Sequence, residues 1–145
     1  MNWKLEAEEK LRRYPAMRQA IRSIPEEIKR LEEQAATLRA VRTDTVSSHG
    51  GVSRGEDRLL NNMAERQELE WALENADRWL KNTERALKTL SREERTVLSR
   101  MLIYPEEGAA QRLCMDLGVE SSSIYRRRDN ALRKFTLALY GSLES

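Results

Sequence analysis

The sequence predicts an all-α protein, and three observations lead to this fold class. Leu, Ala, Glu, Arg and Lys dominate the 145 residues, which include only six glycines and three prolines, a balance that favours long helices over sheets. Apolar residues recur at alternating spacings of three and four along two segments, as in helices that pack along a heptad seam. Helix-capping patterns stand at the starts of three segments. The length leaves room for one domain, or for a small domain with a helical appendage.

The composition also excludes several classes of protein. The chain has one cysteine, Cys114, and one histidine, His49, so a disulfide within the chain is excluded and a Cys/His zinc site is disfavoured. We therefore expect no metal and no cofactor. No apolar run approaches the ~18 residues that would span a bilayer, and the first residues lack the apolar core of a signal peptide. We expect a soluble, cytoplasmic protein that is not bound to a membrane.

Residues 1–88 are expected to form a helical hairpin. Tyr14-Pro15 should end a first short helix, because the residue before a proline is pushed out of the helical conformation. Ser23 and Glu26 have the spacing of a capping box that starts the next helix. The apolar seam of this part has gaps of 3, 4, 3, 4 and 3, and consists of Ile21, Ile24, Ile28, Leu31, Ala35 and Leu38.

Residues 43–56 have the composition of a flexible loop, rich in glycine and small hydroxyl residues. Ser53 and Glu56 are spaced like a second capping box, which should start a helix over 57–88. Its seam consists of Leu69, Leu73, Ala76, Leu80, Thr83, Leu87 and Leu90. Two seams on either side of a loop predict an antiparallel hairpin, and the alternative is that a seam forms a homo-oligomer. Trp71 and Trp79 share a face beside the seam, so we expect both to pack in the core.

Residues 89–145 are expected to form a helix-turn-helix domain. A third capping box, Ser91 to Glu94, should start a helix that runs to about Ile103 and ends at Tyr104-Pro105. The next helices are expected over Glu106–Leu117 and from Ser121 to Tyr140, with glycines closing both. A tight turn that contains glycine between two helices is typical of a helix-turn-helix. The expected inward-facing residues are Leu113, Leu117, Val119 and Ile124, with Cys114 in a structural role where the helices cross.

The last predicted helix carries the basic excess of the chain. Residues 121–140 contain five Lys or Arg and one acid, whereas residues 1–108 contain twenty of each sign. A concentration of positive charge on one helix is what a phosphate-binding surface requires. A solvated arginine-rich face is the alternative, but the preceding turn favours DNA. The candidate DNA-binding residues are Ser121, Ser122, Tyr125, Arg126, Arg128 and Arg133.

These candidates are expected to have different roles in DNA binding. Arg126 shares a face with Ser122 and Tyr125, so we expect it to reach a base edge. Arg128 and Arg133 are expected to contact phosphates. We predict no catalytic residues and no enzyme: Tyr125 beside arginines could be imagined as a nucleophile, but no base or carboxylate cluster accompanies it.

The C-terminal segment resembles a known family. Residues 90–98, Leu-Ser-Arg-Glu-Glu-Arg-Thr-Val-Leu, resemble the start of the fourth region of bacterial primary sigma factors. Leu117-Gly118-Val119, Ile124 and residues 131–135 are similar to the helix-turn-helix and closing helix of that region. The whole layout, with Tyr14-Pro15 and the Ser-rich segment 46–48 before the long helix, resembles phage late-transcription regulators of the RinA and ArpU type.

The resemblance implies a phage or prophage DNA-binding regulator that activates late genes for packaging or lysis in the bacterial cytoplasm. Its implied partners are double-stranded DNA and host RNA polymerase. The chain departs from the family pattern at Glu120, where capping should pass to Ser121, and at Arg127, whose stem should pack while its head reaches the rim. Two alternatives stay open: a helical protein that binds polymerase without reading DNA, and a small terminase-like packaging subunit.

Overall fold

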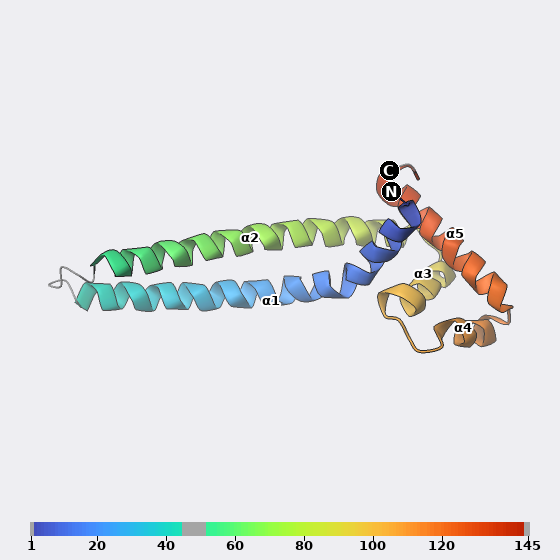
Figure 1. The fold of residues 1–145 in the computed structure, drawn as a ribbon, viewed down its shortest axis with the longest axis horizontal. Coiled ribbons are helices and arrows are strands. Elements are labelled where there is room, and N and C mark those ends of the chain that lie inside the picture. Colours follow the sequence, from blue (N-terminus) through green and yellow to red (C-terminus); the bar gives the residue numbers. More distant parts are fainter. Residues whose placement is uncertain (1, 45–51, 144–145) are drawn as a thin grey trace. The chain divides into compact units, whose positions relative to one another are not determined.

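The computed structural model describes residues 2–44 and 52–143, and over these residues the chain contains helices and no strand (Figure 1). The all-α prediction is confirmed. The elements in chain order are α1 (Trp3–Asp44), α2 (Val52–Lys88), α3 (Arg92–Leu98), the π-helical segment η1 (Ser99–Ile103), α4 (Ala109–Leu117) and α5 (Ser121–Tyr140). None of the helices in the described ranges combines the length and the apolar character needed to cross a membrane.

The chain divides into two compact units. One consists of Gln19–Asp77, and the other joins Met1–Arg18 to Arg78–Ser145. This partition differs from a division at residue 88, because the start of α1 and the end of α2 share a core with the C-terminal helices. That core consists of Ala7, Leu11, Ala86, Leu90, Leu98, Leu102, Ile103, Ala131, Leu132 and Phe135.

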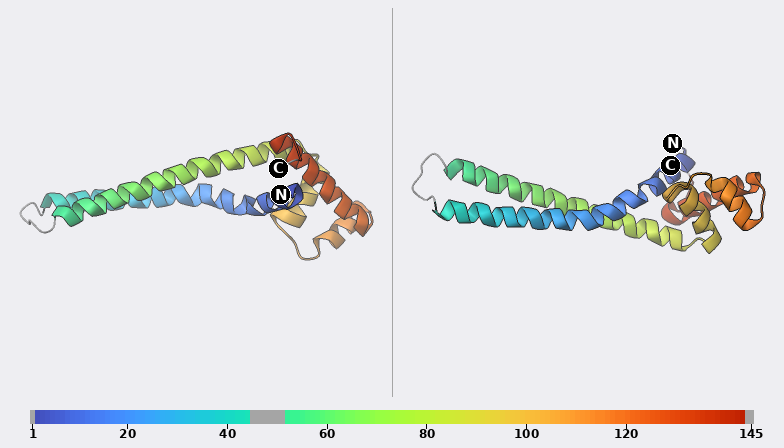
Figure 2. Two further views of the ribbon diagram at one scale, coloured as in Figure 1. Left: turned by 45° about the horizontal axis from the view of Figure 1, so that its top comes forward. Right: turned by 90° about the horizontal axis from the view of Figure 1, so that it is seen from below.

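In the unit of residues 19–77, α1 and α2 run antiparallel and side by side (Figures 1 and 2). Their heptad seams face each other within one chain, with Leu31 and Ala35 almost completely buried. A buried asparagine, Asn62, occupies a seam position seven residues before Leu69. Its amide donates to the Leu31 carbonyl at 2.8 Å, and its oxygen accepts from Arg66 Nε at 2.9 Å. A satisfied polar group in an apolar seam fixes the register of a helix pair.

Helix α1 continues through both of its prolines, so the predicted break at Tyr14-Pro15 and the predicted start at Ser23 are wrong. Proline removes one backbone hydrogen bond and costs about 3 kcal/mol in a helix interior. Packing of the turn that precedes Pro15 opposes this cost. Leu11 is fully buried, and the Tyr14 hydroxyl donates to Glu84 Oε1 of α2 at 2.8 Å. Burial, together with this carboxylate, raises the pKa of Tyr14 to about 12.

The predicted loop at 43–56 is shorter than expected. Helix α1 includes residues 43 and 44, and α2 begins at Val52, before the Ser53–Glu56 capping box that was expected to start it. Residues 45–51 lie outside the described part of the chain. The prediction that this segment is flexible falls on those residues and is therefore not tested. The long helix ends at Lys88, as the sequence predicts.

The expectation that both tryptophans of α2 pack in the core is wrong for Trp71. Its side chain is 69% exposed, because it lies on the face of α2 opposite the seam. Trp79 is half-buried, and its ring is contacted by Lys10 Nζ at 5.4 Å and by the Arg13 guanidinium at 5.9 Å. Cation–π contacts of this kind stabilise by about 0.5–1 kcal/mol at exposed sites.

The C-terminal helices begin and end close to the predicted residues. Ser91 caps α3 through a complete capping box with Glu94, as predicted. The helix then widens into η1, and the N–H of Tyr104, the residue that follows η1, donates to the Ser99 carbonyl at 2.7 Å. Helix α4 starts at Ala109 rather than at Glu106, because Gly108 turns the backbone with φ of 68°.

Candidate nucleic-acid interface

Helices α4 and α5 pack against each other and are joined by a three-residue turn (Figure 1). Gly118 ends α4 with φ of 66°, a conformation that side chains with a Cβ rarely adopt. The next N–H, of Val119, donates to the Cys114 carbonyl at 3.0 Å and closes the turn. Leu113 and Ile124 are buried, as the sequence predicts, whereas Leu117 and Val119 are only partly buried. Cys114 is half-buried.

One face of α5 enters the core, and the opposite face is exposed. The buried face consists of Ile124, Ala131, Leu132, Phe135 and Thr136. The exposed residues opposite it include Ser122, Arg126, Asn130 and Arg133, which follow spacings of 4, 4 and 3 and therefore form a single stripe along the helix. We call these four residues the α5 stripe.

The two arginines of the stripe differ from the other arginines of α5 in their surroundings. Within the described ranges, no carboxylate forms an ion pair with Arg126 or Arg133, although both side chains are exposed. Ser121, Ser122 and Tyr125 are exposed as well. Five of the six candidate residues therefore lie on the surface of α5, with their polar groups open to solvent.

Arg128, the sixth candidate, is instead held by its neighbours. Its guanidinium lies over the Tyr125 ring at 5.2 Å and pairs with Asp129 at 3.4 Å. Asp129 in turn pairs with Lys4 of α1 at 2.8 Å. The sequence gives no local signal for Lys4, because the contact joins residues 125 positions apart. This cluster places a cation of α1 beside α5 and neutralises the one acid of that helix.

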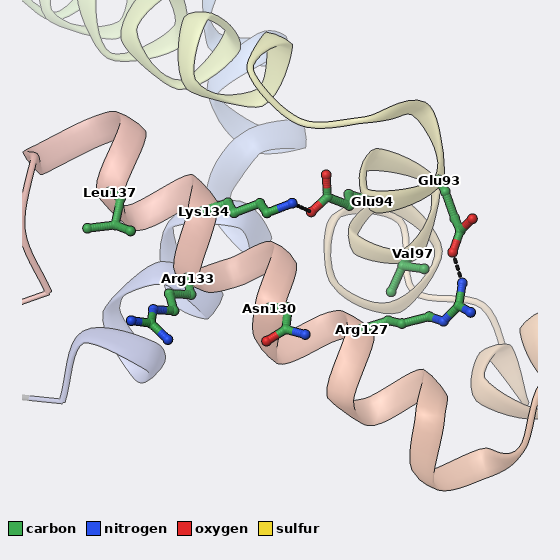
Figure 3. Close-up of a pocket in the computed structure, with 8 residues that line it drawn as sticks. All are labelled: Glu93, Glu94, Val97, Arg127, Asn130, Arg133, Lys134 and Leu137. Carbon is green, nitrogen blue, oxygen red and sulfur yellow. Dashed lines mark ion pairs between the residues drawn. The ribbon is translucent and has the colours of Figure 1, made fainter.

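Arg127 also points away from the stripe, toward α3. It forms an ion pair with Glu93 and donates from Nε to Ser123 Oγ at 3.4 Å. The side chain is partly exposed, in line with the expectation that its head reaches the rim. A parallel pair joins Lys134 to Glu94 at 2.9 Å. Together these pairs tie α3 to α5 at two points (Figure 3).

Glu94 is less exposed than Glu93. It also completes the α3 capping box by accepting from the Ser91 N–H at 2.9 Å. Partial burial alone would raise the pKa of Glu94. The hydrogen bonds from Ser91 and Lys134 outweigh burial and hold that pKa below its usual value. Glu94 therefore stays ionised and anchors α3 and α5 through neutral pH.

A groove of about 480 Å³ lies between α3 and α5 (Figure 3). The two ion pairs account for four of its charged residues, and Val97 and Leu137 supply apolar surface. Asn130 and Arg133 complete the lining. Asn130 is not among the residues predicted from the sequence, although its position between Arg126 and Arg133 in the helical repeat is a signal that indicates it.

Helix α5 is not capped at its start by Ser121, although the sequence predicts this cap. Glu120 is the N-cap residue, with extended backbone and no capping bond from its side chain, and Ser121 is the first helical residue. Capping therefore does not pass to Ser121. The N–H groups of Ser123 and Ile124 donate to the Glu120 carbonyl at 3.0 and 3.2 Å, so backbone bonds alone begin the helix.

Comparisons of the chain with protein-family models, with curated proteins and with solved structures gave no match. Over the described residues, no group of three His, Cys, Asp or Glu side chains is arranged to hold a metal ion.

Proposed function

We propose that the chain binds double-stranded DNA through α5 and acts as a transcription regulator of a phage or prophage. The observation that carries this proposal is the α5 stripe. It presents two arginines that pair with no acid among the residues the structure describes, while the other two arginines of the helix are used in ion pairs within the protein. Arginines left without carboxylates on an exposed helix are suited to bind phosphates and base edges.

The arrangement of α4, the turn and α5 supports docking in the major groove, which admits one α-helix. In such docking the first residues of the second helix approach the base edges, so Ser122 and Arg126 lie deeper than Arg133. Arginine binds guanine O6 and N7 bidentately, and asparagine binds adenine N6 and N7. The stripe therefore carries both groups needed to read purines.

The regulatory role rests on the resemblance of residues 90–135 to the fourth region of sigma factors. It implies activation of late packaging or lysis genes, a cytoplasmic location in the bacterial host and contact with host RNA polymerase. The proposal includes no chemical step, since α5 offers a binding surface and no paired acid and base aimed at a substrate.

Selection of bound duplexes from a random pool tests this function, carried out with host polymerase present and absent. We expect a recurrent sequence to be enriched by the protein alone. Enrichment only when polymerase is present would favour the helical protein that binds polymerase without reading DNA. Absence of duplex binding under both conditions would overturn the proposal, and a large ring in native mass spectrometry would favour the terminase-like alternative.

A further inference from the structure

Within residues 19–77, α2 is apolar on two opposite faces. One is the seam that packs on α1. The other carries Leu60, Met63 and Trp71, which are 61%, 44% and 69% exposed. With Ala64 and Gln67, also exposed, these residues occupy positions i, i+3, i+4, i+7 and i+11, and so share one side of the helix. We call these five residues the outer stripe.

The outer stripe has the character of a binding surface. Large apolar side chains that gather on one exposed face indicate an interaction site, whereas isolated ones do not. Tryptophan is the residue most enriched among those that dominate binding energy at interfaces. In the described part of the chain, the side chain of Trp71 contributes to no buried core. The apolar surface it exposes is therefore available to a partner.

Charge around the outer stripe indicates what kind of partner fits. Exposed acids border it on both flanks and at both ends: Glu56, Asp57, Glu68, Glu70 and Glu74. Residues 54–77 contain seven acidic and three basic residues. One of these bases, Arg66, is bonded to Asn62 on the seam side. The stripe is thus an apolar centre within an acidic rim.

An acidic rim disfavours self-association through this face. A twofold dimer places the same patch of both copies in contact, so acids of one rim would approach acids of the other. Like charges that face each other across an interface are destabilising. A partner with the opposite charge gains both apolar burial and electrostatic attraction.

We propose that the outer stripe of α2 docks a basic amphipathic helix from another protein. The apolar face of that helix covers Leu60, Met63 and Trp71, and its flanking lysines or arginines pair with the acidic rim. Recognition of an amphipathic helix by an apolar surface is a recurring mode of peptide binding. This proposal is independent of DNA binding, which uses α5.

The test uses the full chain labelled with 5-fluorotryptophan and two synthetic helical peptides, one of leucine and lysine and one of leucine and glutamate. The labelled protein gives one fluorine resonance for each of Trp3, Trp71 and Trp79, which a Trp71→Phe sample assigns. We expect the lysine peptide to shift the Trp71 resonance at saturable concentrations and the glutamate peptide to leave it unchanged. Trp71→Gln lacks this resonance, so its affinity for the lysine peptide is measured by isothermal titration calorimetry beside the parent chain, and it should be weaker by about tenfold or more.

Two further variants separate docking from general charge attraction. Glu68→Lys together with Glu70→Lys should weaken binding of the lysine peptide, while Met115→Gln, which alters an apolar side chain 82% exposed on α4, should not. Equal binding of both peptides, or equal losses for Trp71→Gln and Met115→Gln, would overturn the proposal. So would a concentration-dependent dimer of the free chain with Trp71 shielded from an aqueous quencher, which would assign the face to a second copy.

Discussion

At the scale of single residues, the four arginines of α5 divide into two kinds. Arg126 and Arg133 are exposed and pair with no carboxylate of residues 2–44 and 52–143, whereas Arg127 and Arg128 are held by Glu93 and by Asp129. Their spacing in the sequence does not distinguish these roles, because the acids that decide them come partly from another helix. The difference makes the contribution of each arginine testable.

Replacing the two exposed arginines should affect DNA binding differently. Arg126→Ala should cost about 1–3 kcal/mol on the selected duplex and relax preference at one base pair. Arg133→Ala should weaken binding to all duplexes alike. It should also reduce the salt slope, which is the slope of log affinity against log salt concentration, by about one unit. Fluorescence anisotropy on selected and scrambled duplexes at several salt concentrations measures both effects. Arg30→Ala, on α1 in the other compact unit, is the charge-matched control, and equal losses on both duplexes for Arg126→Ala would show a phosphate contact only.

Asn130 should contribute to sequence preference without contributing charge. Asn130→Ala removes a group able to bind adenine bidentately, so it should lower affinity for the selected duplex by about 1–3 kcal/mol and leave scrambled DNA unaffected. The salt slope should stay unchanged, because no ion is lost. Asn61→Ala, an exposed position on α2, is the control. A change in salt slope, or equal affinity of Asn130→Ala and the parent protein for the selected duplex, would contradict this role.

At the scale of elements, α3 and α5 are coupled through Glu94, which caps one helix and pairs with Lys134 of the other. The local capping box was predictable from Ser91 and Glu94, which lie three residues apart. The pair with Lys134 was not, since it depends on how two helices meet. One side chain therefore links a feature fixed by local sequence to one fixed by packing.

This coupling should make stability depend on acidity. The pKa of Glu94 is lowered in the folded chain, so its contribution is present above the unfolded pKa and is lost as pH falls through the folded value. Glu94→Gln keeps an acceptor for Ser91 but removes the ion pair, and should cost about 0.2–1 kcal/mol at neutral pH. Thermal melts of the variant and the parent chain from neutral to acidic pH measure this loss of stability. The difference between the two should disappear at the lowest pH, where Glu94 is protonated. Glu107→Gln, an exposed acid, should show no such trend; an identical trend in both variants would reject the assignment.

Asn62 should determine register in the unit of residues 19–77 more than it determines stability. Asn62→Leu replaces a satisfied polar group by an apolar one of similar size, so the melting temperature should stay or rise. The helices then lose the bond to the Leu31 carbonyl that distinguishes one register from another. Amide NMR spectra should show doubled or broadened peaks for this unit, but not for Asn61→Leu. A single sharp set of peaks with unchanged contacts would show that apolar packing alone sets the register.

At the scale of the whole molecule, the features that depend on short stretches of sequence were predictable, and the features that depend on contacts between distant residues were not. The Ser91 cap, the ends of α4 and α5 at Gly118 and Gly141, and the two seams all follow from short stretches of sequence. The continuity of α1 through Pro15 depends on a core residue and a tyrosine bond that join segments about 70 residues apart. The exposure of Trp71 depends on which face of α2 meets α1.

The most consequential long-range feature is that the first eighteen residues belong to the same compact unit as α5. Leu11 of α1 is fully buried in the core that also holds Leu98 and Phe135. Leu11→Ala should therefore cost about 2–5 kcal/mol and lower the temperature at which duplex binding is lost. Leu5→Ala, at a side chain 62% exposed, should change stability by no more than about 0.5 kcal/mol.

The same reasoning predicts the behaviour of the C-terminal segment by itself. A fragment of residues 89–145 lacks Ala7, Leu11, Ala86 and the Lys4 partner of Asp129, so its core is open to solvent on one side. Thermal unfolding followed by circular dichroism should show a lower and broader transition than the full chain, with weaker duplex binding at the same temperature. If the fragment melts as cooperatively as the full chain and binds DNA equally well, the start of α1 covers the DNA-binding helices without stabilising them.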